Sequence, residues 1–170
     1  KVKCTDCHAH VSAEKPPHPE KLKPVNCATC HDKAVKEYAG TVHAIARKGG
    51  NSVAATCTDC HGTHDIKRPK DPSSPTHHLN LVATCEKCHG SEAVMAKGKL
   101  PRGNVGSKFD DSIHGKALKS AAVMSAPECT DCHGAHSIHP KSDPQSNVAR
   151  AKIPETCGSC HKPERDAYMK

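Results

Sequence analysis

Six copies of one short pattern contain every cysteine of this chain. Each copy has two cysteines three positions apart and a histidine directly after the second. Cysteines with this spacing lie on one face of a helical turn, where both thiols can bond covalently to the vinyl groups of a haem. The next residue then places an imidazole under the iron, so the pattern indicates c-type haem attachment. The six sets are Cys4, Cys7 and His8; Cys27, Cys30 and His31; Cys57, Cys60 and His61; Cys85, Cys88 and His89; Cys129, Cys132 and His133; and Cys157, Cys160 and His161.

Two other uses of paired cysteines fit this sequence less well. Zinc sites combine C-x-x-C pairs but require no histidine after each pair, and thioredoxin-like motifs occur singly within a βαβ pattern. With 15 histidines among 170 residues, the chance that histidine follows all six pairs is below roughly one in a million. All 12 cysteines are used, so none remains for a disulfide. The predicted cofactor is therefore heme c, with six covalently attached groups.

The amino-acid composition indicates that the polypeptide cannot fold without these groups. Leu, Ile, Val and Phe make up only 22 of the 170 residues, about 13%, and there is no Trp. A chain with so few large apolar residues and a net charge of +7 is normally disordered. Six porphyrins supply the missing apolar surface, so folding and haem attachment are expected to be coupled.

The positive charge is expected to balance haem propionates rather than to bind nucleic acid. Each ferric haem with two histidine ligands adds about −1, so six of them would bring +7 to about +1. Nucleic-acid binding also needs aromatic residues for base stacking, and the chain has only three, Tyr38, Phe109 and Tyr168. The sequence has no signal peptide and no apolar run that could span a membrane, so we expect a mature form or a part of a longer chain.

The six motifs alternate between two kinds, which divides the chain into three tandem two-haem repeats. The first motif of each repeat reads C-T-D-C-H and is followed by another histidine two or three residues later, whereas the second motif varies. The two motifs begin 28 residues apart in the second and third repeats and 23 residues apart in the first. The expected architecture is a single domain, 1–170, with repeats at about 1–50, 51–120 and 121–170.

Two amphipathic helices are predicted between the haem motifs. Apolar positions with helical spacing define the first, which a glycine pair at 49–50 ends: Val35, Tyr38, Val42, Ile45 and Ala46. Ser107 is predicted to cap the second, which contains Phe109, Ile113, His114, Ala117, Leu118 and Ala121. Prolines at 16, 17 and 19 and the turn-rich segment 71–75 predict irregular connections. The predicted fold class is mostly irregular coil with a few short α-helices and little or no β structure.

Nine histidines lie outside the motifs, and six irons need six further ligands to become six-coordinate. Four of the nine occupy positions that the repeat makes equivalent. His64 and His136 follow C-H-G-x, where Gly62 permits a tight turn beside the haem, and His64 is expected to ligate a neighbouring haem rather than its own. His43 and His114 each follow a valine or isoleucine in the two predicted helices. These four are predicted distal ligands.

The remaining two distal ligands are less narrowly specified. One is His10 or His18 and the other is His77 or His78. His18 and His77 are favoured because they stand nine and eight residues before the next cysteine. His139 is expected to lie at the surface, since Lys67 occupies the equivalent position of the second repeat.

The string C-x-D-C-H-G-x-H-x-I, followed by Asp-Pro-x-Ser and T-C-x-x-C-H, resembles the multihaem c-type cytochromes of anaerobic respiration. The resemblance covers nearly the whole chain and is clearest in 57–89 and 129–161, whereas the first repeat departs by its shorter spacing and by C-H-A-H. It implies bis-histidine haems stacked close together, which pass single electrons along a chain in the periplasm or outside the cell. Some relatives polymerise into extracellular filaments, and others are periplasmic carriers or subunits of quinol oxidases.

The expected function is therefore electron transfer to and from redox partner proteins, as a filament protomer, a soluble carrier or a domain of a larger cytochrome. A multihaem reductase, the enzymatic alternative, needs an iron with an open position, whereas spare histidines outnumber the irons here. Tyr168 follows His161 as Tyr38 follows His31, but no histidine corresponds to His43 after Tyr168. The repeat is thus open-ended, which favours head-to-tail self-association.

Overall fold

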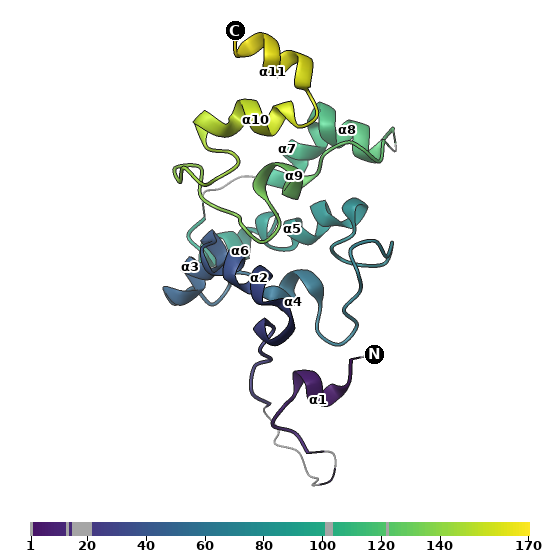
Figure 1. Cartoon of the computed structure of the whole chain (residues 1–170), viewed down its shortest axis with the longest axis vertical. Coiled ribbons are helices and arrows are strands. Elements are labelled where there is room, and N and C mark those ends of the chain that lie inside the picture. Colours follow the sequence, from purple (N-terminus) through teal and green to yellow (C-terminus); the bar gives the residue numbers. More distant parts are fainter. Residues whose placement is uncertain (1, 13, 15–21, 101–103, 122) are drawn as a thin grey trace. The chain divides into compact units, whose positions relative to one another are not determined.

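Short helices joined by irregular segments make up the computed structural model (Figure 1), which describes residues 2–12, 14, 22–100, 104–121 and 123–170. No β-strand occurs within these ranges, so the predicted fold class is confirmed. None of the helices in the described ranges is long and apolar enough to cross a membrane. The proline-rich stretch at 16–19, with His18, lies outside them.

The chain divides into two compact units, Lys1–Glu37 and Tyr38–Lys170. The first unit contains α1 (Cys4–Cys7) and most of α2 (Ala28–Ala39), whose backbone leaves helical geometry at His31. The second unit contains the other helices: α3 (Val42–Lys48), α4 (Cys57–His61), the 3₁₀ helix η1 (His78–Asn80), α5 (Leu81–His89), α6 (Glu92–Lys97), α7 (Val105–Asp111), α8 (Ile113–Lys119), α9 (Cys129–His133), the 3₁₀ helix η2 (Arg150–Lys152), α10 (Ile153–Gly158) and α11 (Lys162–Tyr168). The division into three two-haem repeats remains a prediction.

The aspartate of each C-T-D-C-H motif explains why these short segments are helical. Its carboxylate accepts a hydrogen bond from the backbone N–H three residues earlier, which otherwise has no partner at a helix start. Asp6 bonds the Lys3 N–H at 2.8 Å and Asp59 bonds the Thr56 N–H at 2.7 Å. The hydrogen bond from the Thr56 hydroxyl is the main cause that lowers the pKa of Asp59. The motif thus carries its own start signal for the turn that holds the thiols.

Each of the two predicted helices between the motifs is in fact a pair of helices. The first breaks before Thr41, which caps α3, and the second breaks at Ser112, which caps α8. The prediction that Ser107 is a cap was wrong, because Ser107 lies inside α7 and Asn104 is the cap that accepts its N–H at 3.4 Å. Apolar spacing continues across both breaks, so periodicity alone did not reveal them.

Thr41 and Ser112 make the same pattern of two hydrogen bonds. The Thr41 hydroxyl donates to the Tyr38 carbonyl at 2.7 Å and accepts the Ala44 N–H at 3.2 Å. The Ser112 hydroxyl donates to the Phe109 carbonyl at 2.5 Å and accepts the Gly115 N–H at 3.1 Å. Each cap therefore fixes the start of a helix whose second residue is a predicted distal histidine.

We expect Thr41→Ala and Ser112→Ala each to lower the free energy of unfolding by about 1 kcal/mol, because each leaves a helix N–H without its acceptor. Thr41 is 1% exposed, so water cannot replace the lost hydroxyl there. Denaturant unfolding measures the change, with Thr41→Ser and Ser112→Thr as controls that keep the hydroxyl. Equal stability of the alanine variants and their controls would contradict the assignment of these residues as caps.

The protein interior of the described ranges is small. Its buried hydrophobic residues are Ala54, Val82, Met95, Leu118, Ala126 and Ala149. The accessible surface is 12768 Å² for 18.1 kDa, whereas a folded protein of this mass exposes about 8,100 Å². The polypeptide alone therefore buries too little surface for a stable fold, as its composition indicates.

One hydrophobic cluster lies at the centre of the second compact unit. Val82 of α5, Leu118 of α8 and Ala126 form it, and Phe109 and Cys129 pack against it. Helix α5 packs against α6, α7 and α9, so the cluster joins the second haem motif of one repeat to the first motif of the next.

Candidate haem-binding sites

None of the twelve cysteines forms a disulfide, and none is buried. The first motifs of the second and third repeats coincide with α4 and α9, and the fourth motif forms the last turn of α5. The sixth motif begins near the end of α10, and its His161 is the N-cap of α11. Each of these pairs of thiols is therefore accessible to a haem and is placed by helical backbone.

Cys30 and Cys160, the second cysteines of the second and sixth motifs, are predicted attachment points that the structure leaves exposed. The Cys30 N–H donates to the Cys27 carbonyl at 3.3 Å, and the Cys160 N–H donates to the Cys157 carbonyl at 3.2 Å. Each pair of thiols therefore spans one tight turn. Both thiols are exposed to water in the polypeptide alone. An attached haem would cover them. Covalent attachment at Cys30 and Cys160 stays a prediction.

Three pairs of histidine rings face one another in the second compact unit. The ring centres are 6.1 Å apart for His43 and His89, 6.0 Å for His61 and His136, and 6.0 Å for His114 and His161. In each pair one ring belongs to a C-x-x-C-H motif and the other is a predicted distal ligand. Four distal candidates were predicted from equivalent positions of the repeat. The structure places three of them, His43, His114 and His136, opposite a motif histidine.

The separation of these rings fits two axial ligands of one iron. A metal–imidazole bond of about 2.0–2.1 Å places the ring centre about 3.1 Å from the metal, so two opposite ligands lie about 6.2 Å apart. Each ring can rotate about its bond to the metal, so the angles of 56°, 19° and 37° between ring planes are all compatible with ligation. The residues present therefore fit a bis-histidine haem at each of these three positions.

The pairing follows the repeat. His43 and His114 lie on equivalent helices, and each faces the second motif of the repeat that follows it. His136 of the third repeat faces His61, which belongs to the first motif of the second repeat. Sequence analysis predicted the members of these pairs as ligands but did not predict which motif histidine each distal candidate would face.

Burial favours the protonation state that binds metal in one pair. Desolvation is the largest cause that lowers the pKa of His43 and of His89 below the usual value of 6.5. Electrostatic repulsion adds to it, from His89 on His43 and from His133 on His89. A lowered histidine pKa keeps the imidazole neutral, and only neutral imidazole is a ligand.

The glycine of C-H-G-x-H has a conformation that other residues rarely adopt. Gly62 has φ 79° and ψ −173°, and Gly134 has φ 81° and ψ 158°. This region is essentially restricted to glycine. It lets the chain leave the motif helix sharply before the histidine three residues after the motif histidine, and in the third repeat that histidine, His136, faces His61. Repeat one has Ala9 at this position, and Ala9 is not among the described residues with a positive φ.

The sulfur atoms of successive motifs lie close together in chain order. Cys88 contributes to the raised pKa of Cys60, although burial is the larger cause. A hydrogen bond with Cys129 is the main cause that raises the pKa of Cys85. Burial is the largest cause that raises the pKa of Cys132, and the nearby Cys157 is the second. These sulfurs are thioethers once haem is attached and do not titrate, but their proximity joins motifs three, four, five and six in that order.

Other histidines have different surroundings. The Nδ1 atom of His77 accepts the Leu79 N–H at 3.3 Å and caps η1, so its ligation of iron stays a prediction. His139 is not at the surface as predicted, because its side chain is only 12% exposed and its Nδ1 lies 3.2 Å from the Asp143 carboxylate. His10 is exposed, and ligation by it or by His64 remains a prediction.

Two family models match parts of the chain. The model described as "Doubled CXXCH motif" matches residues 121–166, which hold both motifs of the third repeat. The model described as "Cytochrome c554 and c-prime" matches residues 26–90, which run from the second motif through the fourth. A search of the curated proteins and a search of the solved structures each found no match.

Proposed function

We propose that this multihaem c-type cytochrome transfers electrons along a row of six bis-histidine haems and is not an enzyme. The main support is the set of three imidazole pairs with ring centres 6.0–6.1 Å apart. A haem iron that has two imidazole ligands in addition to the porphyrin has no open coordination position. Catalysis of a substrate reaction at the metal needs such an open position. Haem c supplies reversible one-electron chemistry when bound.

The proximity of the sulfur atoms supports a linear order of the haems. The thiol contacts link the motifs at Cys60 and Cys88, at Cys85 and Cys129, and at Cys132 and Cys157. Thioether bonds at these positions would hold the edges of consecutive haems beside one another. We propose that electrons enter and leave at the two ends of this row and pass through the haems in the order of their motifs.

The setting of this function is also a proposal. Covalent attachment of haem c is typical of exported proteins, which supports a periplasmic or extracellular location with redox proteins as partners. Head-to-tail association into a filament is the proposed form of self-assembly. Electron microscopy of the native preparation tests it, since dispersed single particles at all concentrations would leave only the soluble carrier.

We expect the purified protein to contain six haems per chain, because all six motifs are complete. Haem quantification together with intact mass measures the number. A mass that matches the bare polypeptide, or one that corresponds to four haems, would be incompatible with the proposal.

The oxidised protein is expected to have only low-spin iron in electron paramagnetic resonance. The control is addition of cyanide or nitrite, which should leave the spectrum unchanged because each iron already has six ligands. A stoichiometric high-spin centre that binds either anion would favour a reductase instead.

A further inference from the structure

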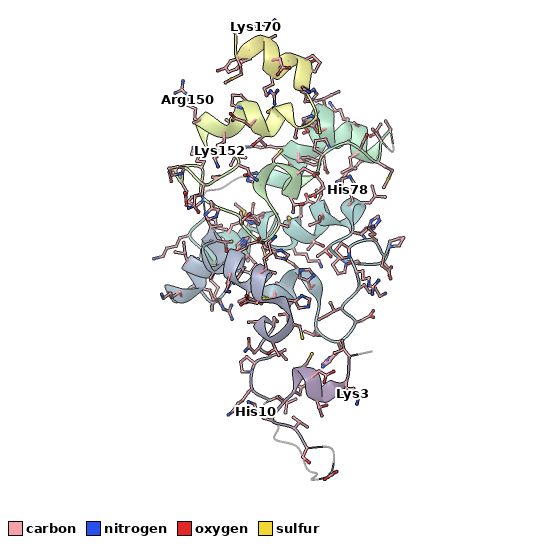
Figure 2. All side chains as sticks on the ribbon, in the orientation of Figure 1. Lys3, His10, His78, Arg150, Lys152 and Lys170 are labelled. Carbon is pink, nitrogen blue, oxygen red and sulfur yellow. The ribbon has the colours of Figure 1, made fainter. Side chains whose placement is uncertain are left out.

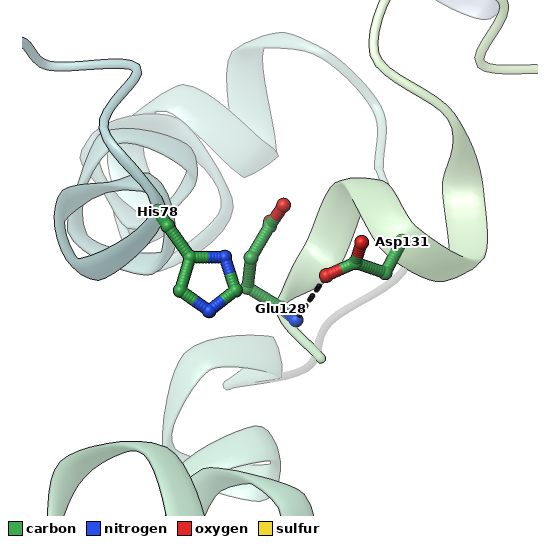
Figure 3. A group of neighbouring side chains, drawn as sticks. All are labelled: His78, Glu128 and Asp131. Carbon is green, nitrogen blue, oxygen red and sulfur yellow. Dashed lines mark hydrogen bonds between the residues drawn. The ribbon is translucent and has the colours of Figure 1, made fainter. Parts of the chain in front are cut away.

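A histidine and two carboxylates from different parts of the second compact unit lie together beside α9 (Figure 3). His78 is the first residue of η1, Glu128 is the N-cap of α9, and Asp131 lies within α9. One ligand atom from each of the three side chains lies within 4.8 Å of the other two. Figure 2 shows His78 among the side chains of the described residues.

The most unusual atom of the cluster is Nε2 of His78. It is buried and has no hydrogen-bond partner among the described residues. Burying a nitrogen without a hydrogen-bond partner is destabilising, so such atoms are rare unless a ligand or an ion satisfies them. One ring nitrogen of His78 lies within 4.8 Å of a carboxylate oxygen of Glu128 and of one of Asp131, and carboxylates attract a cation.

Glu128 is the second unusual member, because it is a carboxylate that is only 4% exposed. Its Oε2 accepts the Thr130 N–H at 2.7 Å, and its Oε1 accepts the Thr130 hydroxyl. The Glu128 N–H donates in turn to Asp131 at 2.8 Å (dashed in Figure 3). A carboxylate offers about four lone-pair positions, so both acids keep capacity for a further partner after these bonds.

His78 is not placed to ligate the haem irons of this unit. At about 100° per residue, Asp131 lies roughly 160° around α9 from His133, so its carboxylate and the His78 ring are on the side away from that iron. The other three motif histidines of the unit, His61, His89 and His161, already face imidazole partners. The ring of His78 is therefore not assigned to any iron of this unit.

We propose that His78, Glu128 and Asp131 form a binding site for a divalent transition-metal ion such as Zn²⁺. Zinc accepts neutral imidazole nitrogen and carboxylate oxygen at about 2.0–2.2 Å, and its tetrahedral ligands lie roughly 3.3 Å apart. The three atoms must therefore move together by up to about 1.5 Å, which requires rotation of the His78 ring as well as of the exposed Asp131 side chain. Asp131 also lines an open depression with Asn147 and Thr156, from which water can complete the coordination.

His78 and Glu128 of this site are not repeated at the equivalent positions of the other repeats. Arg150 stands in the third repeat where His78 stands in the second, and Thr56 stands where Glu128 does. An arginine cannot ligate a cation, and a threonine hydroxyl lacks the charge that attracts one. The chain should therefore bind one such ion, which links η1 to the helix that carries the fifth haem motif.

The test is zinc binding to the haem-loaded protein after chelator treatment and dialysis. We expect one Zn²⁺ per chain by elemental analysis, and titration calorimetry should show at least about 10-fold weaker binding for His78→Ala, Glu128→Gln and Asp131→Asn. The two amide variants keep the acceptor oxygens for Thr130 and Glu128, so the α9 turn should persist. The haem absorption spectrum should stay unchanged throughout, which excludes capture of a haem ligand by zinc.

His139→Ala is the control, because it removes another poorly exposed imidazole that is not a predicted haem ligand, and it should leave zinc affinity unchanged. Two results would overturn the proposal: no stoichiometric zinc on the wild-type protein, or equal affinities for the His78→Ala and His139→Ala variants. The first result would leave a structural role at the start of α9 as the only role of Glu128 and Asp131. Neither result depends on the number of haems or on electron transfer.

Discussion

Replacing His43, His114 or His136 by alanine is expected to convert one low-spin iron to high spin in each variant. The reason is geometric, because each of these rings lies 6.0–6.1 Å from the ring of a motif histidine, the separation of two axial ligands. Removal of one ring leaves that iron with five ligands and shifts its reduction potential. Electron paramagnetic resonance and the absorption spectrum of the oxidised protein measure the conversion.

The design contains its own internal checks. The double variant with His43→Ala and His114→Ala should contain two high-spin irons, since the two residues face different motif histidines. His139→Ala is the control, because its Nδ1 lies beside Asp143 and it is not a predicted ligand. His64→Ala is expected to act like His136→Ala, on the basis of the repeat. Unchanged spectra of both would show that the assignment of the C-H-G-x-H histidines is wrong.

Replacement of Cys85 and Cys88 by alanine is expected to destabilise the second compact unit more than any single side-chain change. The fourth haem would attach through α5, and Cys85 is hydrogen-bonded to Cys129, which packs on the Val82–Leu118 cluster. A haem buries more apolar surface than a tryptophan, so we expect a loss above the about 3–5 kcal/mol of a buried Trp→Ala change. Thermal unfolding and far-ultraviolet circular dichroism of the variant measure this loss.

Replacement of Cys157 and Cys160 by alanine is the matched comparison. It also removes one pair of attachment thiols, but Cys157 and Cys160 are exposed, whereas Cys85 and Cys88 are partly buried. We expect a smaller loss, confined to α10 and α11. Equal stabilities of the two double variants and the wild type would mean that the polypeptide folds without its haems, contrary to its composition.

The local parts of each site were determined by the sequence alone. The C-x-x-C-H spacing specifies one helical turn with two thiols and an imidazole, and the internal aspartate supplies the helix start. The glycine of C-H-G-x-H predicted a turn, and Gly62 and Gly134 have the positive φ that such a turn uses. These features depend on residues fewer than five positions apart, so backbone geometry and hydrogen bonding within one turn are sufficient to predict them.

Only the tertiary structure decided which residues meet. His61 and His136 are far apart in the chain, and their approach depends on how α3, α4 and the third repeat pack. One contact of this kind is the hydrogen bond at 3.0 Å from the Val42 N–H to the carbonyl of Ile138, two residues after His136. Long-range packing of this kind leaves no periodic signal in one sequence. The cluster of His78, Glu128 and Asp131 was missed for the same reason, because His78 is 50 residues before Glu128 in the chain and belongs to another segment.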